Sequence, residues 1–216
     1  EALVFRQFWG KPKSWFNYIR LGVLGGLVYS HDGDLTDRGL TLGAMYQGNL
    51  ESQVNLHANF VRTLYDGQYF DTAYGMLTSR IRPFSGSEIG LQGQAGQAID
   101  YDGSRLAHVF AAGPYSSFSL FRHLNLLASY TYERLSLGGE TLYAANLGQA
   151  RAVWNFNVRS FVRAILQYRD QKQNPAMYGF PVDSRTRRLF TQFLFSYKIN
   201  PRTVLFLGYS DNSMGG

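Results

Sequence analysis

The feature that most constrains this chain is a two-residue alternation of apolar and polar side chains that runs through several long segments. In residues 53–65 one set of alternate positions holds Val54, Leu56, Ala58 and Phe60, and the other holds Asn55, His57 and Asn59. Residues 39–49, 89–101, 162–169 and 189–199 show the same pattern. Successive side chains of a β-strand point to opposite faces, so the pattern predicts strands with one apolar and one polar face.

Segment length separates a membrane protein from a soluble one. The alternating segments span about 11 to 17 residues, whereas strands of soluble proteins average about 5–6 residues and a tilted membrane strand needs about 9–11. The phase of the alternation slips within residues 143–157, which predicts a β-bulge there. About twelve up-and-down strands are predicted, at residues 2–9, 15–30, 38–50, 52–65, 70–82, 88–101, 105–120, 124–135, 141–156, 159–170, 187–199 and 202–211.

Composition agrees with this interpretation. Aromatic residues make up 16% of the chain and charged residues 17%, against about 25% charged residues in ordinary soluble domains. No apolar stretch approaches the roughly 20 residues of a membrane helix. A soluble propeller would also alternate, but it would show a blade-like repeat, which the sequence lacks. We therefore predict an all-β, antiparallel, up-and-down transmembrane β-barrel, with these strands forming part of a larger barrel.

Several function classes are disfavoured. The chain has no cysteine, which excludes thiolate metal sites and cysteine nucleophiles. Its net charge is +6, but the basic residues are scattered without a dense block, so nucleic acid is not an expected partner. The only cluster, Arg185, Arg187 and Arg188, is assigned to a loop.

The connections between the predicted strands alternate in character, as in outer-membrane barrels. We assign tight turns to the periplasmic side, at residues 49–51, 121–123, 157–159 and 200–202. We assign loops rich in Asp and Gly to the cell surface, at residues 31–34, 66–67 and 102–103, with 171–187 as the longest.

The chain starts at Glu1 without a signal peptide and ends in residues 213–216, which are predicted to form a loop. These ends predict that residues 1–216 are a barrel fragment lacking an N-terminal part and a final strand.

Three stretches in the last third resemble a known family. They are residues 129–135 (SYTYERL), 156–161 (FNVRSF) and 195–212, which begin FSYKINPRTV. They resemble the C-terminal outer-membrane β-barrel of unknown function that follows a family-nine carbohydrate-binding-like domain in Gram-negative bacterial proteins. The resemblance covers the chain from about residue 114 and implies location and fold. The carbohydrate-binding-like domain is absent from this chain, so no residue inherits a glycan-binding role.

The alternation assigns individual residues to lipid or lumen. The expected lipid-facing residues are Leu56, Phe60, Leu166, Phe193 and Phe195. The expected lumen cations are Arg163, Arg169 and Lys198, with Arg151 and Arg80 as further members. Such cations would favour anions in a narrow pore. Alternatively, they pair with Glu133 or Asp100 on neighbouring strands and brace the lumen.

Other polar residues suggest chemistry only weakly. His57 is interpreted as a hydrogen-bonded lumen residue rather than an acid–base group. His108, Ser104 and Ser116 have no carboxylate residue at a sequence spacing that would indicate a serine hydrolase. Loop residues Asp32, Asp34, Asp37 and Asp66 could bind calcium or touch cations that bridge lipopolysaccharide, but solvated turns are the simpler interpretation. No catalytic residue, metal or cofactor is assigned.

The functional expectation follows from location. The chain is expected in the bacterial outer membrane, as a passive pore or as the anchor of an exported glycan-binding domain. The alternatives are a structural subunit of a larger outer-membrane complex and an outer-membrane barrel enzyme. The expected partners are outer-membrane lipid and lipopolysaccharide, small solutes or glycans, and other subunits of such a complex.

Overall fold

The computed structural model describes residues 1–215 and consists almost entirely of β-strands. The strands are β1 (Ala2–Trp9), β2 (Phe16–Tyr29), β3 (Leu35–Gly48), β4 (Gln53–Tyr65), β5 (Gln68–Ile81), β6 (Ser87–Asp100), β7 (Arg105–Leu120), β8 (Leu124–Leu137), β9 (Glu140–Asn157), β10 (Ser160–Gln173), β11 (Arg185–Asn200) and β12 (Thr203–Gly215). One 3-10 turn, η1 (Pro175–Met177), interrupts the β10–β11 connection. Within residues 1–215 no helix is long and apolar enough to cross a membrane.

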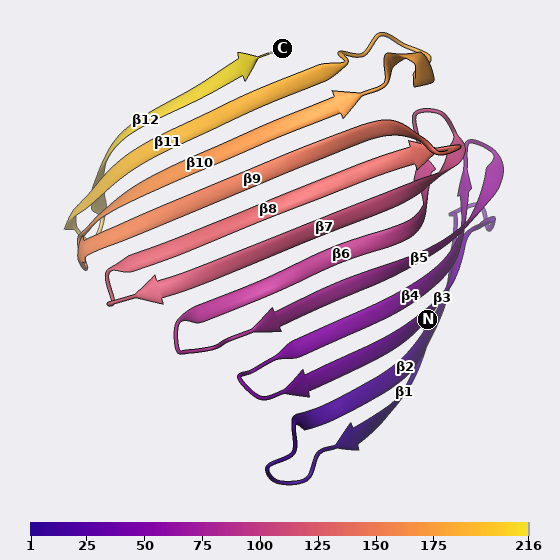
Figure 1. Cartoon of the computed structure of the whole chain (residues 1–216), viewed down its shortest axis with the longest axis horizontal. Helices are drawn as coiled ribbons and strands as arrows, with labels where there is room; N and C mark the ends of the chain where they lie inside the picture. Colours follow the sequence, from indigo (N-terminus) through magenta and orange to yellow (C-terminus); the bar gives the residue numbers. More distant parts are fainter. Residues whose placement is uncertain (216) are drawn as a thin grey trace.

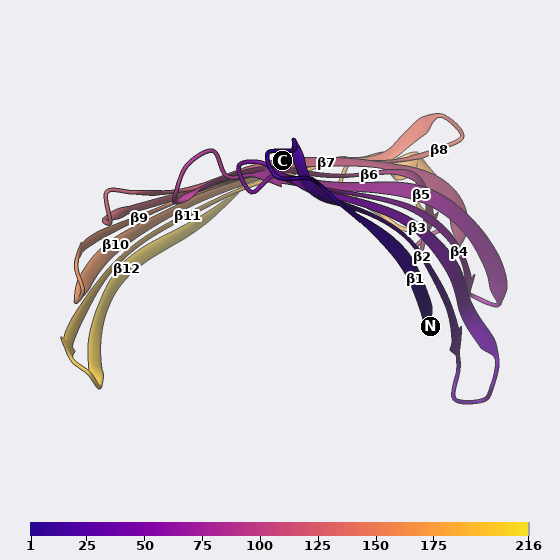
Figure 2. The same ribbon diagram turned by 90° about the horizontal axis from the view of Figure 1, so that it is seen from below.

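All twelve strands belong to one sheet in which each pairs with its sequence neighbours, in the order β1 to β12 (Figure 1). Every pairing is antiparallel, so the prediction of an all-β, up-and-down arrangement of twelve strands is confirmed. The sheet is arched, with β1 and β12 bent away from its middle toward the same side (Figure 2).

Two of the predicted boundaries are wrong. Residues 213–215 were expected in a loop, but they continue β12, where Gly215 pairs with Arg187. The 185–188 segment was expected inside a loop that starts at residue 171, but β10 extends to Gln173 and β11 begins at Arg185. In both cases backbone pairing with the neighbouring strand overrides a weakly apolar local sequence. Gly216 lies outside the described residues.

The predicted phase slip is present near the end of β9. The register between β9 and β10 passes from Asn155 to Asn157 and skips Phe156. The register between β8 and β9 skips Leu142 near the other end of the strand. The middle of β9 pairs without interruption on both sides.

The connections lie at two ends of the sheet. At one end, two-residue turns require positive φ, as at Asp66 and Gly67, whose φ values are 49° and 74°. The longest connection among the described residues, 174–184, lies at the same end, together with residues 30–34 and 101–104.

At the other end Arg82, in the β5–β6 connection, lies 2.7 Å from Glu51 and 2.9 Å from Glu88. These carboxylates raise the pKa of the Arg82 guanidinium further above its usual value.

The register divides the side chains into two faces, because directly paired residues share a face. One row reads Leu21, Ala44, Leu56 and Leu77, and the row beside it on the opposite face reads Gly22, Gly43, His57 and Met76. We call the two faces the apolar face and the polar face.

Residues on the polar face are more buried than residues on the apolar face, which is the reverse of a soluble sheet. On the polar face Asn59 and Ser196 are only 8% and 3% exposed, whereas Leu56 and Phe193 on the apolar face are each 51% exposed. Side chains converge on the concave side of an arch and separate on its convex side. We therefore assign the polar face to the concave side.

Candidate functional site: a polar face and the loop folded over it

Hydrogen bonds between neighbouring strands connect the polar face. Thr41 Oγ1 donates to Asn59 Oδ1 at 2.8 Å, and Asn55 Nδ2 donates to Thr78 Oγ1 at 3.1 Å. The Arg80 guanidinium donates to Gln53 Oε1 at 2.9 Å. These cross-strand bonds satisfy polar groups that a two-layer β-protein would replace with an apolar core.

The structure places all five sequence-predicted lumen cations on the polar face but does not arrange them in a ring. Arg151, Arg163, Arg169 and Lys198 lie on β9, β10 and β11, whereas Arg80 lies apart on β5. Arg163 donates to Gln192 Oε1 at 2.9 Å. On this face β10 and β11 carry no acidic residue, because Asp170, their only acid, lies on the apolar face opposite Arg187. The cations thus form a basic strip along one side of the sheet.

The acids proposed to brace these cations have other partners. Glu133 accepts a hydrogen bond from the Tyr143 hydroxyl, and Asp100 accepts one from Arg105 Nε at 2.7 Å. Within residues 1–215 none of the five cations lies within ion-pair distance of a carboxylate. A ladder of ion pairs across this face is therefore not what the structure shows.

Sequence reasoning missed one member of the basic strip. Arg188 lies on the polar face directly opposite Arg169, but the loop prediction had removed it from the strand pattern. Like charges that face each other across a strand pair destabilise the pairing unless they are well solvated. Both guanidinium groups are exposed, which agrees with water on this side. Residues 185–188 are all polar, so no apolar–polar alternation marks them as a strand in the sequence.

The five sequence-predicted lipid-facing residues share the opposite face. Leu56 and Phe60 lie on β4, Leu166 on β10, and Phe193 and Phe195 on β11. The register pairs Leu166 with Thr191 and pairs Val162 with Phe195, which keeps all of them on one side of the sheet. Four of the five are exposed in the structure, and Phe195 is half-buried.

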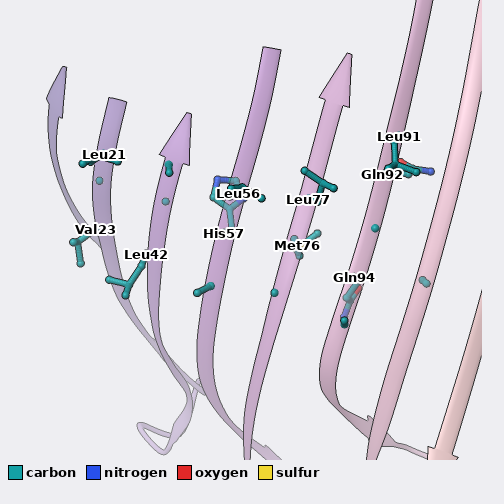
Figure 3. A pocket seen from close by; sticks show the side chains of 18 of the residues that line it. Leu21, Val23, Leu42, Leu56, His57, Met76, Leu77, Leu91, Gln92 and Gln94 are labelled. Carbon is teal, nitrogen blue, oxygen red and sulfur yellow. The ribbon is translucent and has the colours of Figure 1, made fainter. Parts of the chain in front are cut away.

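A shallow depression marks the apolar face over β2 to β6. Leu21, Leu42, Leu56, Leu77 and Leu91 come from five successive strands around it (Figure 3). Its floor is made by small residues between them, such as Ala58, Gly75 and Ala95. Its lining is almost wholly apolar, so it offers contact to a hydrocarbon chain rather than a site for polar chemistry.

The long β10–β11 connection folds over the loop end of the polar face. Arg105, on β7, donates to the backbone oxygen of Met177 at 2.6 Å, although the two residues are 72 positions apart. Asn174 N donates to Leu142 O at 3.0 Å. The connection therefore reaches across β9 and β8 to β7 and packs over the loop ends of these three strands.

Apolar contacts hold the same connection. Met177 and Tyr178 pack against Ala107, Leu135 and Leu142, which are 0%, 7% and 1% exposed. Leu142 is the residue skipped in the β8–β9 register, and it is the largest fully buried side chain among the described residues. The bulge thus supplies an anchor point for the covering segment.

The remaining candidate residues do not assemble into a catalytic site. Ser116 and His108 lie eight positions apart on β7, about 26 Å along the strand. Ser104 donates to Asp66 Oδ2 at 2.8 Å. Asp37, expected in a loop, lies in β3 and pairs with Thr63. Within residues 1–215 no three metal-ligating side chains gather, so these acidic residues form no metal cluster.

Comparisons with known proteins give no guidance. The chain matches no protein-family model and no curated protein.

The covering segment, residues 174–184, can be tested by proteolysis of intact cells that produce the full-length protein. Proteinase K should cut within residues 174–184, because this connection lies on the proposed cell-surface side and exposes Phe180 and Gly179. It should spare the Pro201–Arg202 turn at the opposite end of the sheet. Mass spectrometry of the fragments identifies the cut. Cleavage at Pro201 with an intact 174–184 segment would show that the Pro201 end of the sheet, and not the 174–184 end, lies at the cell surface.

Proposed function

We propose that this chain forms the wall of a transmembrane β-barrel in the outer membrane of a Gram-negative bacterium. Its apolar face would contact lipid and its polar face would line a water-filled lumen. The observation that carries the proposal is the distribution of burial: the polar face is enclosed by the arch and hydrogen-bonded, while the apolar face is open. A soluble sheet buries its apolar face against a second layer, and the buried apolar residues of the described chain are only Phe70, Ala107, Leu135 and Leu142.

Strand dimensions support the same proposal. From β2 to β12 the strands contain 13 to 18 residues. A tilted membrane strand needs about 9–11 residues, and the surplus can extend beyond the bilayer. In a bilayer, unpaired backbone groups at a sheet edge are costly, so the edges formed by β1 and β12 must be satisfied. Because the strand number is even, β1 and β12 run antiparallel and can pair with each other or with strands of a larger barrel.

Within this location we propose a passive role, without catalysis, resident metal or cofactor. The basic strip on β9 to β11 supports passage of small anionic solutes. Residues 174–184, folded over the loop end, narrow the path for such solutes. This observation favours the second candidate, a barrel that anchors an exported domain. The sequence resemblance supports a glycan-binding domain as the anchored partner. The exposed apolar residues of β12 support a third candidate, assembly with other subunits.

Reconstitution tests the membrane proposal. The refolded chain should insert into lipid vesicles and show heat-modifiable migration on an electrophoretic gel, which is typical of membrane β-barrels. A chain that stays in solution as a folded monomer would contradict the proposal.

The covering segment provides a sharper test of the lumen. Arg105→Ala removes the bond to Met177 O and leaves the buried Asp100 carboxylate without its partner. A hydrogen bond to a charged group contributes about 1.5–3 kcal/mol, so opening of the segment should become about tenfold or more frequent. We expect faster proteolysis within residues 174–184 and, for an open barrel, longer high-conductance states in planar bilayers. Arg188→Ala removes a cation from the same face without touching the segment and should change neither the proteolysis rate nor the lifetime of these states.

A further inference from the structure

Cations on the apolar face gather at the loop end of the strands. Six of them lie there, on five different strands: Arg38, Arg62, Arg134, Lys172, Arg185 and Arg187. Among the described strands the remaining cation of this face is Arg6 on β1, which is in register with Leu21, in the row of Leu56 and Leu77. If these cations served only to keep the sheet soluble, we would expect them at both ends of the strands, not mainly at the loop end.

Four of these cations form a compact group on β8 to β11, which we call the basic patch: Arg134, Lys172, Arg185 and Arg187. Arg134 and Lys172 both pair in register with Ala144, one from each side of β9. Lys172 lies directly opposite Arg185 across β10 and β11. Between Arg134 and Lys172, Ala144 contributes only a methyl group to this face.

The patch contains one carboxylate, Asp170, which contacts only Arg185 and Arg187 of the four cations. Asp170 accepts from Arg185 Nε at 2.8 Å and from a terminal Arg185 nitrogen at 2.6 Å, and Arg187 Nε lies 3.7 Å from it. Within residues 1–215 Arg134 and Lys172 have no carboxylate within ion-pair distance. Buried Arg187 Nε has no hydrogen-bond partner there. Four cations and one anion leave a net charge of +3, so the patch lacks counter-charge.

The patch borders the apolar band directly. The next row toward the middle of the sheet contains Tyr130, Gly148, Tyr168 and Leu189, and below it lie Leu166 and Phe193. Tyrosine at the edge of an apolar band is typical of the membrane interface. A ligand that fits this surface has anionic groups at the height of the patch and hydrocarbon at the height of Leu166.

We propose that the basic patch binds the phosphate groups of lipid A, the phosphorylated glycolipid anchor of lipopolysaccharide in the outer leaflet. This inference rests on the proposed membrane function, because it requires the apolar face to contact lipid. Arginine binds phosphate through paired N–H groups and lysine as a point charge. The patch would occupy the interface of the outer leaflet, since the long 174–184 connection lies at the same end of the sheet.

A second group on the same face supports this assignment. Arg62 forms a two-point ion pair with Asp71, and Arg38 pairs in register with Arg62. Together with Leu40 and Phe60 these residues line a groove at the loop end of β2 to β5. It repeats the combination of cations above and apolar side chains below, although here Asp71 offsets the charge of Arg62.

The test uses the refolded chain in detergent, with native mass spectrometry to count bound lipid. The probes are diphosphoryl lipid A, the same lipid with its phosphates removed, and phosphatidylglycerol. The variant Arg134→Gln with Lys172→Gln removes two cations that make no ion pair with any of residues 1–215, so it leaves the Asp170–Arg185 pair intact. Arg188→Gln with Lys198→Gln removes the same charge from the polar face and serves as the matched control. Heat-modifiable migration reports folding of each variant.

We expect the parent chain and the control to bind diphosphoryl lipid A in preference to the other two lipids. Because it removes two of the four cations of the patch, the Arg134/Lys172 variant should lose about tenfold or more of that affinity. Equal binding with and without phosphate, equal loss in the control, or preference for phosphatidylglycerol would overturn the inference while leaving the membrane proposal standing. Failure of the parent chain to show heat-modifiable migration or to insert into vesicles would overturn both.

Discussion

Replacing Leu166 with Arg should lower the free energy of unfolding of the membrane-inserted protein by about 2–4 kcal/mol, the cost of a cation at the lipid-facing midplane of a β-barrel. Leu166 lies in the middle of β10 on the apolar face and is 49% exposed in the structure. In water a substitution at such a half-exposed surface site changes stability by only about 0.5 kcal/mol. The size of the effect therefore reports the surrounding medium.

Gln167→Arg is the matched control, because Gln167 is the next residue of β10 and points to the polar face. It should change the free energy of unfolding little. The measurement is equilibrium unfolding in denaturant of protein reconstituted in lipid vesicles, followed by tryptophan fluorescence. Equal, small effects of the two substitutions would show that both faces contact water. A larger effect of Gln167→Arg would show that the face assigned to the lumen is the one that contacts lipid.

Reversing the charge of Arg163 and Arg169 should convert an anion-preferring pore into one that prefers cations. Both residues lie on the polar face of β10, and within residues 1–215 neither has a carboxylate within ion-pair distance. Fixed charge close to the ion path sets the local ion population. Physiological salt screens charges beyond about 8 Å, so the shift is large only where the lumen is narrow.

The measurement is the reversal potential across a planar bilayer under a salt gradient, with full-length protein. Arg163→Glu with Arg169→Glu should move the reversal potential from the anion side toward the cation side. Arg134→Glu with Lys172→Glu changes the same charge on the opposite face, leaves the Asp170–Arg185 pair in place and should leave the reversal potential unmoved. Bilayers that stay silent, with protein shown to be folded, would eliminate the passive-pore reading and leave anchoring or assembly.

The regular part of the fold could be predicted from sequence because each strand carries its own signal. Residues 53–65 alternate without interruption, and β4 spans Gln53–Tyr65 as expected. The same alternation assigned Leu166 and Arg163 to opposite faces, which the register reproduces. Neither inference needs knowledge of a partner strand.

The parts that sequence reasoning missed depend on contacts between distant residues. Arg185 was assigned to the long loop at residues 171–187. Its place in a strand depends on pairing with Lys172 and on the bond to Asp170, both of which lie on the other side of the 174–184 connection. The bond from Arg105 to Met177 leaves no periodic trace in the sequence. Both the basic patch and the covering segment were therefore out of reach without coordinates.

Cysteine labelling at two adjacent positions tests the central claim most directly, because the chain has no cysteine of its own. Leu56 and His57 are neighbours on β4, both exposed, and they point to opposite faces. In protein reconstituted in lipid, a membrane-impermeant maleimide should label His57→Cys, which faces the lumen, and should leave Leu56→Cys unlabelled until detergent and denaturant are added. Rapid labelling of Leu56→Cys in the lipid-reconstituted protein would show that the apolar face meets water, and it would contradict the assignment of this sheet to a membrane.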